Sequence, residues 1–316
     1  MFPLLPRRRL LAAALAPLCA PALAAAATTL RVGDQRGGAQ PLMQAAGVLS
    51  GLGYKVEWSQ FAGAPMLMEA LNAGAIDAGG IGDAPFVSGI AAAIPMRAVS
   101  ATRADGAVTA LVVPASSPVR SVADLKGRSI ATLKGQTGHF LVLAALRRAG
   151  LQARDVTFVF IAPAEAKSAL ASGGVDAWAS WGPYIALARV QDGAREIVNG
   201  RDLMSGQSYT VAGTAAIAGK REVLADFLRR LRLARDWGLA NPAEQARVWS
   251  AQTGFPLPVG RVVVDTAQTR TVAIDPEVIA AQQRVADFFR DAGVIPQAQR
   301  ASAYFDASFN TAIFAA

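Results

Sequence analysis

Residues Leu71–Phe86 have the sequence LNAGAIDAGGIGDAPF, which predicts the end of a helix, a short buried strand and a turn that opens the next helix. The same order returns in Leu170–Tyr184, LASGGVDAWASWGPY, where Asp176 corresponds to Asp77 at an offset of 99 residues. Similar stretches at a fixed spacing indicate a repeated structural unit. The segments around the two stretches test that interpretation.

The surrounding segments repeat as well. LRVGDQRGG (30–38) corresponds to SIATLKGQ (129–136), and VEWSQF (56–61) corresponds to VTFVFI (156–161). Each lobe therefore contains three strand–loop–helix units in the same order. We predict an α/β protein with two similar lobes, each a mixed and mainly parallel sheet flanked by helices. The cleft between the lobes is the candidate site.

The expected organisation follows from these repeats. Residues 28–112 form the first part of lobe 1, and residues 113–210 form lobe 2. Residues 211–316 return to lobe 1 and are mostly helical. The amphipathic segment Arg221–Leu239 carries five arginines away from its apolar side, and we expect that charged face to be solvated. Asn241-Pro242 and Asp275-Pro276 each predict a helix start with a capping side chain.

Residues 1–24 have the features of a secretory signal peptide. Three arginines (Arg7–Arg9) precede the apolar run Leu10–Leu18, and Ala22-Leu23-Ala24 offers a small-x-small cleavage site. The arginines also resemble a twin-arginine export signal, although that motif is incomplete. The single cysteine, Cys19, lies in this segment, so we expect no disulfide or thiol chemistry after cleavage. The predicted location is the periplasm.

Composition narrows the class of partner. The formal net charge is +8, of which the three leader arginines supply part, leaving about +5 after cleavage. That balance suits an anionic ligand, but general basicity explains it equally well. No basic run interleaved with aromatic residues is present, so nucleic-acid binding is not indicated. No cofactor or metal motif is present either, and we expect none to be bound.

The candidate ligand site lies where strands end and helices begin. Parallel α/β units bind ligands outside the carboxyl ends of their strands, and helix starts attract anions. Up to six helix starts could face the cleft. The predicted ligand-binding residues all belong to such loops: Gln35, Arg36, Gly63, Ala64, Gly82, Asp83, Gly135, Gln136, Thr137, His139, Trp181 and Tyr184.

Several of these residues have structural explanations that compete with ligand binding. Gly37, Gly38 and Gly135 can serve tight turns, and Arg36 and Lys134 can face solvent. A third group has a structural prediction only, as core or turn residues: Asp77, Asp176 and Trp178.

His139 is the single histidine of the chain, and a packing or capping role is as plausible for it as ligand contact. A Ser/His/Asp triad stays open, but no nucleophile-elbow motif supports one. No catalytic residue is therefore assigned.

The chain resembles the periplasmic aliphatic-sulfonate-binding proteins of ABC transporters, within the nitrate/sulfonate/taurine-binding group. The resemblance rests on LRVGDQRGG (30–38), EALNAGAIDAGGIGDAP (69–85), SPVRSVADLKGRSIATLKG (117–135), VDAWASWGPY (175–184) and AGVIP (292–296). It implies a two-lobed type II, or Venus flytrap, fold whose chain crosses twice between lobes. It also implies a monomer that captures an organosulfonate in the cleft and delivers it to a membrane permease and ATPase.

The family motif carries over residue by residue. Gln35 matches the family glutamine of the first loop, and Arg36 replaces its usual lysine. Further positions match the third loop, the histidine after the Lys-Gly loop and the aromatic turn, namely Gly82, Asp83, His139, Trp181 and Tyr184.

Other cleft positions depart from the family: Gln136-Thr137 replaces serines, Ala64 and Met66 replace glycine and glutamine, and Gly182 replaces aspartate. A different ligand therefore stays open: nitrate, an aromatic sulfonate or sulfate ester, taurine, or a thiamine-precursor pyrimidine. A secreted enzyme that uses His139 is the remaining alternative.

Overall fold

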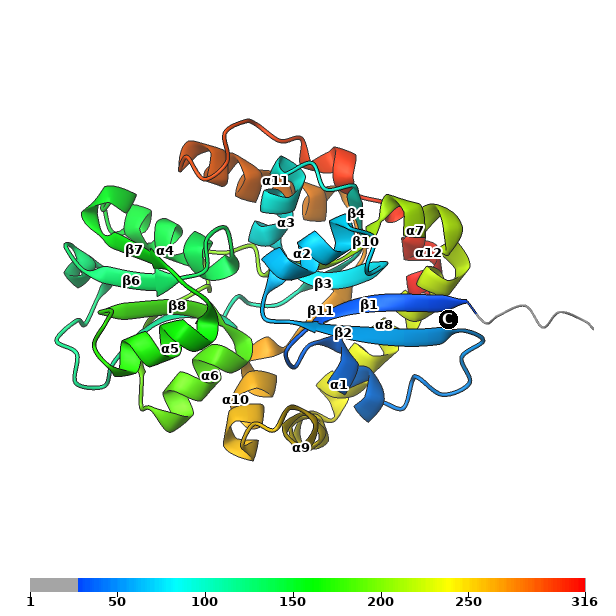
Figure 1. Ribbon diagram of the computed structural model, residues 1–316, viewed down its shortest axis with the longest axis horizontal. Helices are drawn as coiled ribbons and strands as arrows, with labels where there is room; N and C mark the ends of the chain where they lie inside the picture. The colour runs from blue at the N-terminus through cyan, green and yellow to red at the C-terminus, as the bar shows by residue number, and fades with distance from the viewer. Residues whose placement is uncertain (1–27, 316) are drawn as a thin grey trace, which may run out of the picture.

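The computed structural model describes residues 28–315, which form two α/β lobes side by side (Figure 1). The predicted fold class is confirmed. The first lobe contains a sheet of order β11-β4-β10-β3-β1-β2. Its strands are β1 (Thr29–Gln35), β2 (Lys55–Phe61), β3 (Ala78–Gly82), β4 (Met96–Arg103), β10 (Gln207–Gly213) and β11 (Arg270–Val272).

The second lobe contains a sheet of order β7-β6-β8-β5-β9. Its strands are β5 (Thr109–Val113), β6 (Ser129–Thr132), β7 (Thr157–Phe160), β8 (Ala177–Trp181) and β9 (Arg195–Asn199). Its helices are α4 (Thr137–Arg148), α5 (Pro163–Ala171) and α6 (Gly182–Gln191), with short 3-10 turns at Val122–Leu125 and Ala153–Asp155.

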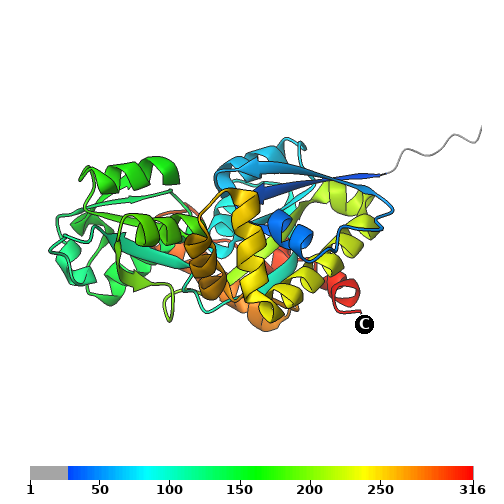
Figure 2. The same cartoon turned by 90° about the horizontal axis from the view of Figure 1, so that it is seen from below.

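The remaining helices belong to the first lobe. Those before the first crossing are α1 (Ala39–Ala45), α2 (Ala64–Asn72) and α3 (Asp83–Ala91). Those after the return are α7 (Thr214–Gly219), α8 (Arg221–Ala240), α9 (Pro242–Thr253), α10 (Leu257–Ala267), α11 (Pro276–Asp291) and α12 (Asn310–Ile313), with 3-10 turns at Ala301–Tyr304 and Ala307–Phe309. Seen from below, α8, α9 and α10 follow one another along the underside of the molecule (Figure 2).

The two sheets match strand for strand, because β2-β1-β3 in one lobe corresponds to β7-β6-β8 in the other. In both, the outer two strands run parallel to the middle one. Beside each set lies one antiparallel strand, β10 in the first sheet and β5 in the second. Each of these two strands follows a crossing between the lobes, so the chain completes each sheet with a strand that arrives from the other lobe.

The crossing strands also locate the lobe boundaries. The boundaries expected at 112/113 and 210/211 fall inside β5 and β10. A strand that pairs along its whole length belongs to the sheet that it enters. The connections therefore lie just before these strands, in residues 104–108 and 200–206.

Asp77 and Asp176 are structural, and they act in the same way. The Asp77 carboxylate accepts from the backbone N–H of Arg31 at 2.8 Å, and the Asp176 carboxylate accepts from that of Ser129 at 2.8 Å. Each therefore fixes the turn before its strand to the neighbouring parallel strand. Asp77 is 4% exposed and also pairs with the Arg31 guanidinium and the Lys220 ammonium, both at 2.6 Å.

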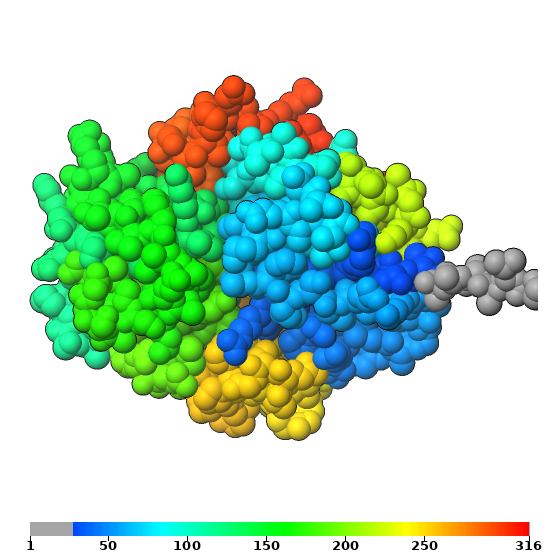
Figure 3. All heavy atoms as spheres, in the orientation of Figure 1, coloured from blue at the N-terminus to red at the C-terminus, as the bar shows by residue number. Residues whose placement is uncertain are grey.

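Apolar side chains join the lobes on two sides of the interface. One cluster combines Val87 of α3, Leu143 of α4 and Phe289 of α11. The other combines Ala186 of α6 with Trp249 of α9 and Val259 of α10. Figure 3 shows lobe 2, in green, meeting the orange C-terminal segment on one side and the yellow-orange segment of α9 and α10 on the other. The lobes are therefore in contact around the space between them.

The C-terminal third is mostly helical, as predicted, but α10 and β11 were not anticipated. Val259 and Val263 of α10 are buried against lobe 2, a tertiary contact that no local pattern announces. The Asp275 side chain caps α11 by accepting from the Val278 N–H at 2.8 Å. The capping prediction for Asn241 is wrong: its side-chain amide donates to the Trp237 carbonyl oxygen instead.

Within residues 28–315, no helix is both long and apolar enough to cross a membrane. The predicted signal peptide, residues 1–24, lies outside the described residues.

Replacing Asp77 by Ala tests the proposed function of this carboxylate as an anchor. The change leaves two cations and a backbone N–H without their acceptor, so we expect the free energy of unfolding to fall by about 3 kcal/mol. Asp176→Ala is the matched control, with an expected loss of about 1 kcal/mol because Asp176 is 34% exposed. Urea denaturation at neutral pH measures both, and equal losses would contradict the assignment.

The difference in stability between wild type and Asp77→Ala should depend on pH. Burial opposes ionisation of Asp77, but its hydrogen bonds to Arg31 and Lys220 outweigh that effect and hold its pKa below the ordinary value. Its stabilisation is therefore complete above a pH of about 4 and is lost as the pH falls through the lowered pKa. The gap in stability between wild type and Asp77→Ala should narrow only in that acidic range.

Candidate functional site

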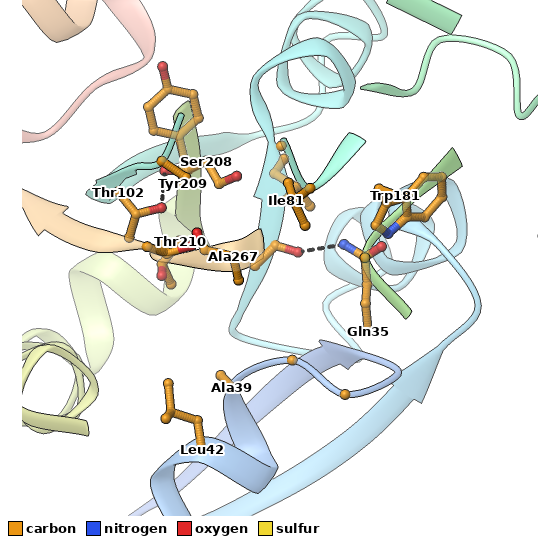
Figure 4. Close-up of a pocket in the computed structure, with 18 of the residues that line it drawn as sticks. Gln35, Ala39, Leu42, Ile81, Thr102, Trp181, Ser208, Tyr209, Thr210 and Ala267 are labelled. Carbon is orange, nitrogen blue, oxygen red and sulfur yellow. Dashed lines mark hydrogen bonds between the residues drawn. The ribbon is translucent and has the colours of Figure 1, made fainter. Parts of the chain in front are cut away.

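A cavity of about 350 Å³ lies where the two lobes meet, outside the carboxyl ends of β1 and β3 (Figure 4). Lobe 1 lines most of it, through the ends of β1, β3, β4 and β10 and through α8, α9 and α10. Lobe 2 contributes the starts of α4 and α6. The volume lies within the range of about 300–1,000 Å³ that is usual for small-molecule sites, and exceeds what an inorganic anion fills.

The start of α1 is already occupied by a side chain of this chain. The buried Asp34 carboxylate accepts from the backbone N–H groups of Gln35, Ala39 and Gln40 at 2.9–3.0 Å. Burial raises the pKa of Asp34, and these hydrogen bonds oppose that shift. The helix start is therefore satisfied internally and offers little to a second anion.

The start of α3 also carries its own acid. Asp83 is 1% exposed, its carboxylate accepts from the Ala84 N–H at 2.7 Å, and the Ser205 hydroxyl donates to it. Burial raises the pKa of this carboxyl group. Up to six helix starts were expected to face the cleft. Those of α1, α3, α4 and α6 border the cavity, and a carboxyl group of the chain already occupies the first two.

The starts of α4 and α6 are different. Neither has a side-chain cap, and both border the cavity through Gln136 and Thr137 and through Trp181, Gly182 and Pro183. At α6 the Gly182 N–H donates to the Val108 carbonyl oxygen at 2.8 Å and Pro183 has no N–H, so α4 offers more first-turn donors than α6. First-turn N–H groups and the helix dipole favour an anion at such positions. These helix starts therefore make lobe 2 one anion-attracting part of the cavity wall.

The structure brings seven of the predicted residues into the cavity lining. They are Gln35, Arg36, Gly82, Asp83, Gln136, Thr137 and Trp181. The Gln35 side-chain amide donates to the Gly80 carbonyl oxygen at 2.9 Å, which fixes it across the strand ends (Figure 4). Arg36 is exposed and its guanidinium lies 4.3 Å from the centre of the Phe255 ring, where it also donates to the Thr253 carbonyl oxygen.

The other five predicted residues lie outside the lining and hold the lobes together or pack. Gly63 and the buried Ala64 begin α2. Gly135 accepts through its carbonyl oxygen from the Ser88 hydroxyl of lobe 1 at 3.1 Å. The Tyr184 hydroxyl donates to the Ala62 carbonyl oxygen of lobe 1 at 3.2 Å.

His139, the fifth, is a packing residue in this structure. Its Nδ1 accepts from the Gly135 N–H at 3.2 Å, and its ring meets Phe158 and Phe160 edge-on. Burial and the nearby Lys134 lower the pKa of His139 to about 4, so the ring is neutral at physiological pH. Among the described residues, no group of three or more His, Cys, Asp or Glu side chains could hold a metal ion.

Glycine is required at two of the candidate turns. Gly37 has φ +79°, and a Cβ there would lie 2.6 Å from the Trp249 ring, whose indole N–H donates to the Gly37 carbonyl oxygen. Gly135 has φ +71°, and a Cβ there would lie 2.7 Å from the Ser88 hydroxyl. The structural explanation is therefore sufficient for both.

Sequence reasoning missed the side of the cavity formed by β4, β10 and the C-terminal helices. Polar side chains at the strand ends line it, namely Thr102, Gln207, Ser208 and Thr210, as does Arg235 of α8. The Thr102 hydroxyl donates to the Ser208 carbonyl oxygen at 3.2 Å (Figure 4). The expectation of a fully solvated arginine face on α8 is wrong at Arg235, which is half-buried, lines the cavity and donates to the Thr271 hydroxyl of β11.

Comparison with known proteins places the chain in a family. Residues 52–245 match the family described as NMT1/THI5 like. A protein of Escherichia coli (strain K12) named as an aliphatic-sulfonate-binding protein is 34% identical over 280 residues, which cover 85% of each chain. The chain belongs to the NMT1/THI5-like family.

Solved structures agree with this assignment. The alkanesulfonate-binding protein SsuA of Xanthomonas axonopodis, bound to MOPS, matches with a TM-score of 0.81 and 29% identity over 90% of this chain and 99% of that one. The periplasmic aliphatic sulphonate binding protein SsuA of Escherichia coli matches with a TM-score of 0.78 and 30% identity over 87% of this chain and 91% of that one.

Replacing Asp34 tests whether a side chain closes the start of α1. Asp34→Ala removes the acceptor of three N–H groups, and we expect the free energy of unfolding to fall by about 1–2 kcal/mol. Asp34→Asn keeps an acceptor oxygen and should lose less than half as much. Thermal and urea unfolding measure both variants. Equal losses for the two variants would show that the capping hydrogen bonds contribute little.

Proposed function

We propose that this protein is an extracytoplasmic solute-binding protein that captures an aliphatic sulfonate between its lobes and delivers it to an ABC importer. The observation that most supports this proposal is the interlobe cavity, which combines helix starts that have no side-chain cap with apolar walls. Similarity to sulfonate-binding proteins over most of the chain supports the same ligand class. The partners are the importer's permease and ATPase, the location is the periplasm, and the protein acts as a monomer.

The sulfonate head lies against the starts of α4 and α6 in this proposal. Backbone N–H groups of the first turn of α4 and the Thr137 hydroxyl donate to its oxygens. The organic tail contacts Trp181 and the apolar lining of lobe 1. Contact between the lobes removes water from the anion, which strengthens these electrostatic interactions and favours the closed arrangement when ligand is present.

An enzymatic function using His139 has no support in this geometry. The ring lies outside the cavity lining and its Nδ1 is engaged by the Gly135 N–H. The relatives reported above, which are 30% and 34% identical to this chain over most of its length, are named as binding proteins. We therefore propose binding without turnover.

Calorimetry with a small panel of anions tests the proposed function. We expect ethanesulfonate and hexanesulfonate to bind, hexanesulfonate more tightly because it buries more apolar surface. Nitrate and sulfate should bind weakly, because neither fills the apolar part of the cavity. Binding of nitrate or a pyrimidine without any sulfonate would overturn the proposal.

The Trp181→Ala variant separates the tail from the head. It should weaken hexanesulfonate binding by about 1–3 kcal/mol and leave an inorganic anion nearly unaffected. Phe160→Ala serves as the aromatic control, since Phe160 is 43% exposed and lies outside the cavity lining. A loss of equal size in both variants would argue against contact between Trp181 and the tail.

A further inference from the structure

The cavity continues from the lobe interface into lobe 1, between the first sheet and the C-terminal helices. Its walls there are apolar and come from four helices: Leu42 of α1, Phe227, Leu231 and Leu239 of α8, Trp249 of α9, and Val263, Val264 and Ala267 of α10. Figure 4 shows Leu42 and Ala39 on one side of this space and the strand ends with Thr102 and Thr210 on the other. This inner region is separate from the helix starts of α4 and α6, which lie in lobe 2.

One cation, Arg235, lies in this apolar region. It stands on α8 one turn after Leu231, which also lines the cavity. Its guanidinium has five N–H donors, and the described residues offer one hydrogen-bond acceptor, the Thr271 hydroxyl at 3.3 Å. Among residues 28–315, no carboxylate oxygen lies within 4.0 Å of it.

The other arginines of α8 show how unusual this position is. Arg229 and Arg230 both pair with Asp226, at 2.9 and 2.7 Å, and Arg232 pairs with Asp236 at 3.1 Å. Arg221, the fourth, pairs with Asp306 at 3.4 Å, so each of these four arginines has a carboxylate partner. Arg235 is attracted by Asp236 and Asp34 only over a longer distance, and Asp34 is already engaged by three backbone N–H groups.

Partial burial of this guanidinium disfavours its charged form. Surrounding protein atoms lower the pKa of Arg235 to about 10, so the group is still charged at neutral pH. A crowded cation with unused donors beside an apolar wall is stabilised when a ligand brings an acceptor to it.

We propose that Arg235 forms a second polar subsite, which binds a hydrogen-bond acceptor at the far end of the ligand's tail. The protein is then built for sulfonates that end in a carboxylate or a comparable acceptor, in preference to simple alkanesulfonates. The inference rests on the proposed function, since it takes the sulfonate head to lie at the lobe 2 helix starts. A tail that ends in an ammonium group is disfavoured, because it would face the guanidinium.

Three probes of one chain length test the subsite: hexanesulfonate, and hexanesulfonate bearing a terminal carboxylate or a terminal ammonium. Calorimetry on the full-length protein should find the carboxylate probe bound roughly tenfold more tightly than hexanesulfonate, about 1.4 kcal/mol. The ammonium probe should bind more weakly than both. Equal affinities for all three probes would overturn the subsite while leaving the proposed function intact, whereas no binding of any probe would overturn both.

Two substitutions on α8 assign the effect to a residue. In Arg235→Gln the ratio of the affinity for the carboxylate probe to that for hexanesulfonate should fall from about tenfold to about one. Arg229→Gln, on the same helix but outside the cavity, should keep the wild-type preference. An equal fall in affinity for hexanesulfonate and the carboxylate probe would mean that Arg235 holds the sulfonate head, which overturns the assignment.

A third variant keeps the assignment testable if Arg235→Gln does not fold. Arg235→Lys keeps the positive charge but loses the planar set of donors, so it should retain part of the carboxylate preference. Retention of the full preference in both Arg235 variants would overturn the assignment to this residue.

Discussion

The two crossing strands are the constraint on which the rest of this structure depends. β10 lies in the first sheet between β3 and β4, and β5 lies in the second between β8 and β9. Their ladder hydrogen bonds are internal to each sheet, so neither lobe is complete without the chain that returns from the other. The connections before both strands therefore pass side by side between the lobes, and the cavity forms beside them.

The two walls of the cavity differ in electrostatic character for a local reason. In lobe 1 the carboxyl groups of Asp34 and Asp83 accept from backbone N–H groups at the starts of α1 and α3, so these donors are already satisfied by the chain itself. In lobe 2 the equivalent helix starts of α4 and α6 have no side-chain cap. A pseudo-symmetric fold thus presents two different walls. In lobe 1 the helix starts are satisfied by the chain's own carboxyl groups and the cation Arg235 lines the cavity, whereas in lobe 2 the helix starts have no side-chain cap.

Much of this arrangement could be predicted from the sequence, because each repeated unit is marked by residues that are close together along the chain. Each strand–loop–helix unit is marked by apolar strand residues and a Gly- or Pro-containing turn, and the two copies support each other. Asp77 and Asp176, which correspond in the two sequence repeats, also have equivalent structural roles, since each accepts a hydrogen bond from the strand beside its own turn.

The missed features depend on contacts between distant segments. Arg235 looks like any surface arginine of an amphipathic helix, and only the packing of α9 and α10 turns its surroundings into a cavity wall. Val259 and Val263 likewise are buried by contact with α6, a helix of the other lobe, which the sequence around them does not indicate. Gly135 lies in the loop before α4 and Tyr184 in the first turn of α6, yet both form hydrogen bonds across the interface and do not line the cavity.

The apolar clusters that bridge the lobes have a thermodynamic consequence. A movement that parts the lobes at one of them exposes such side chains as Val259 or Leu143 to water. Closure around a ligand then buries protein surface in addition to the ligand's own. The heat-capacity change of binding should accordingly be more negative than the ligand's area alone accounts for, and the excess measures how far the lobes part.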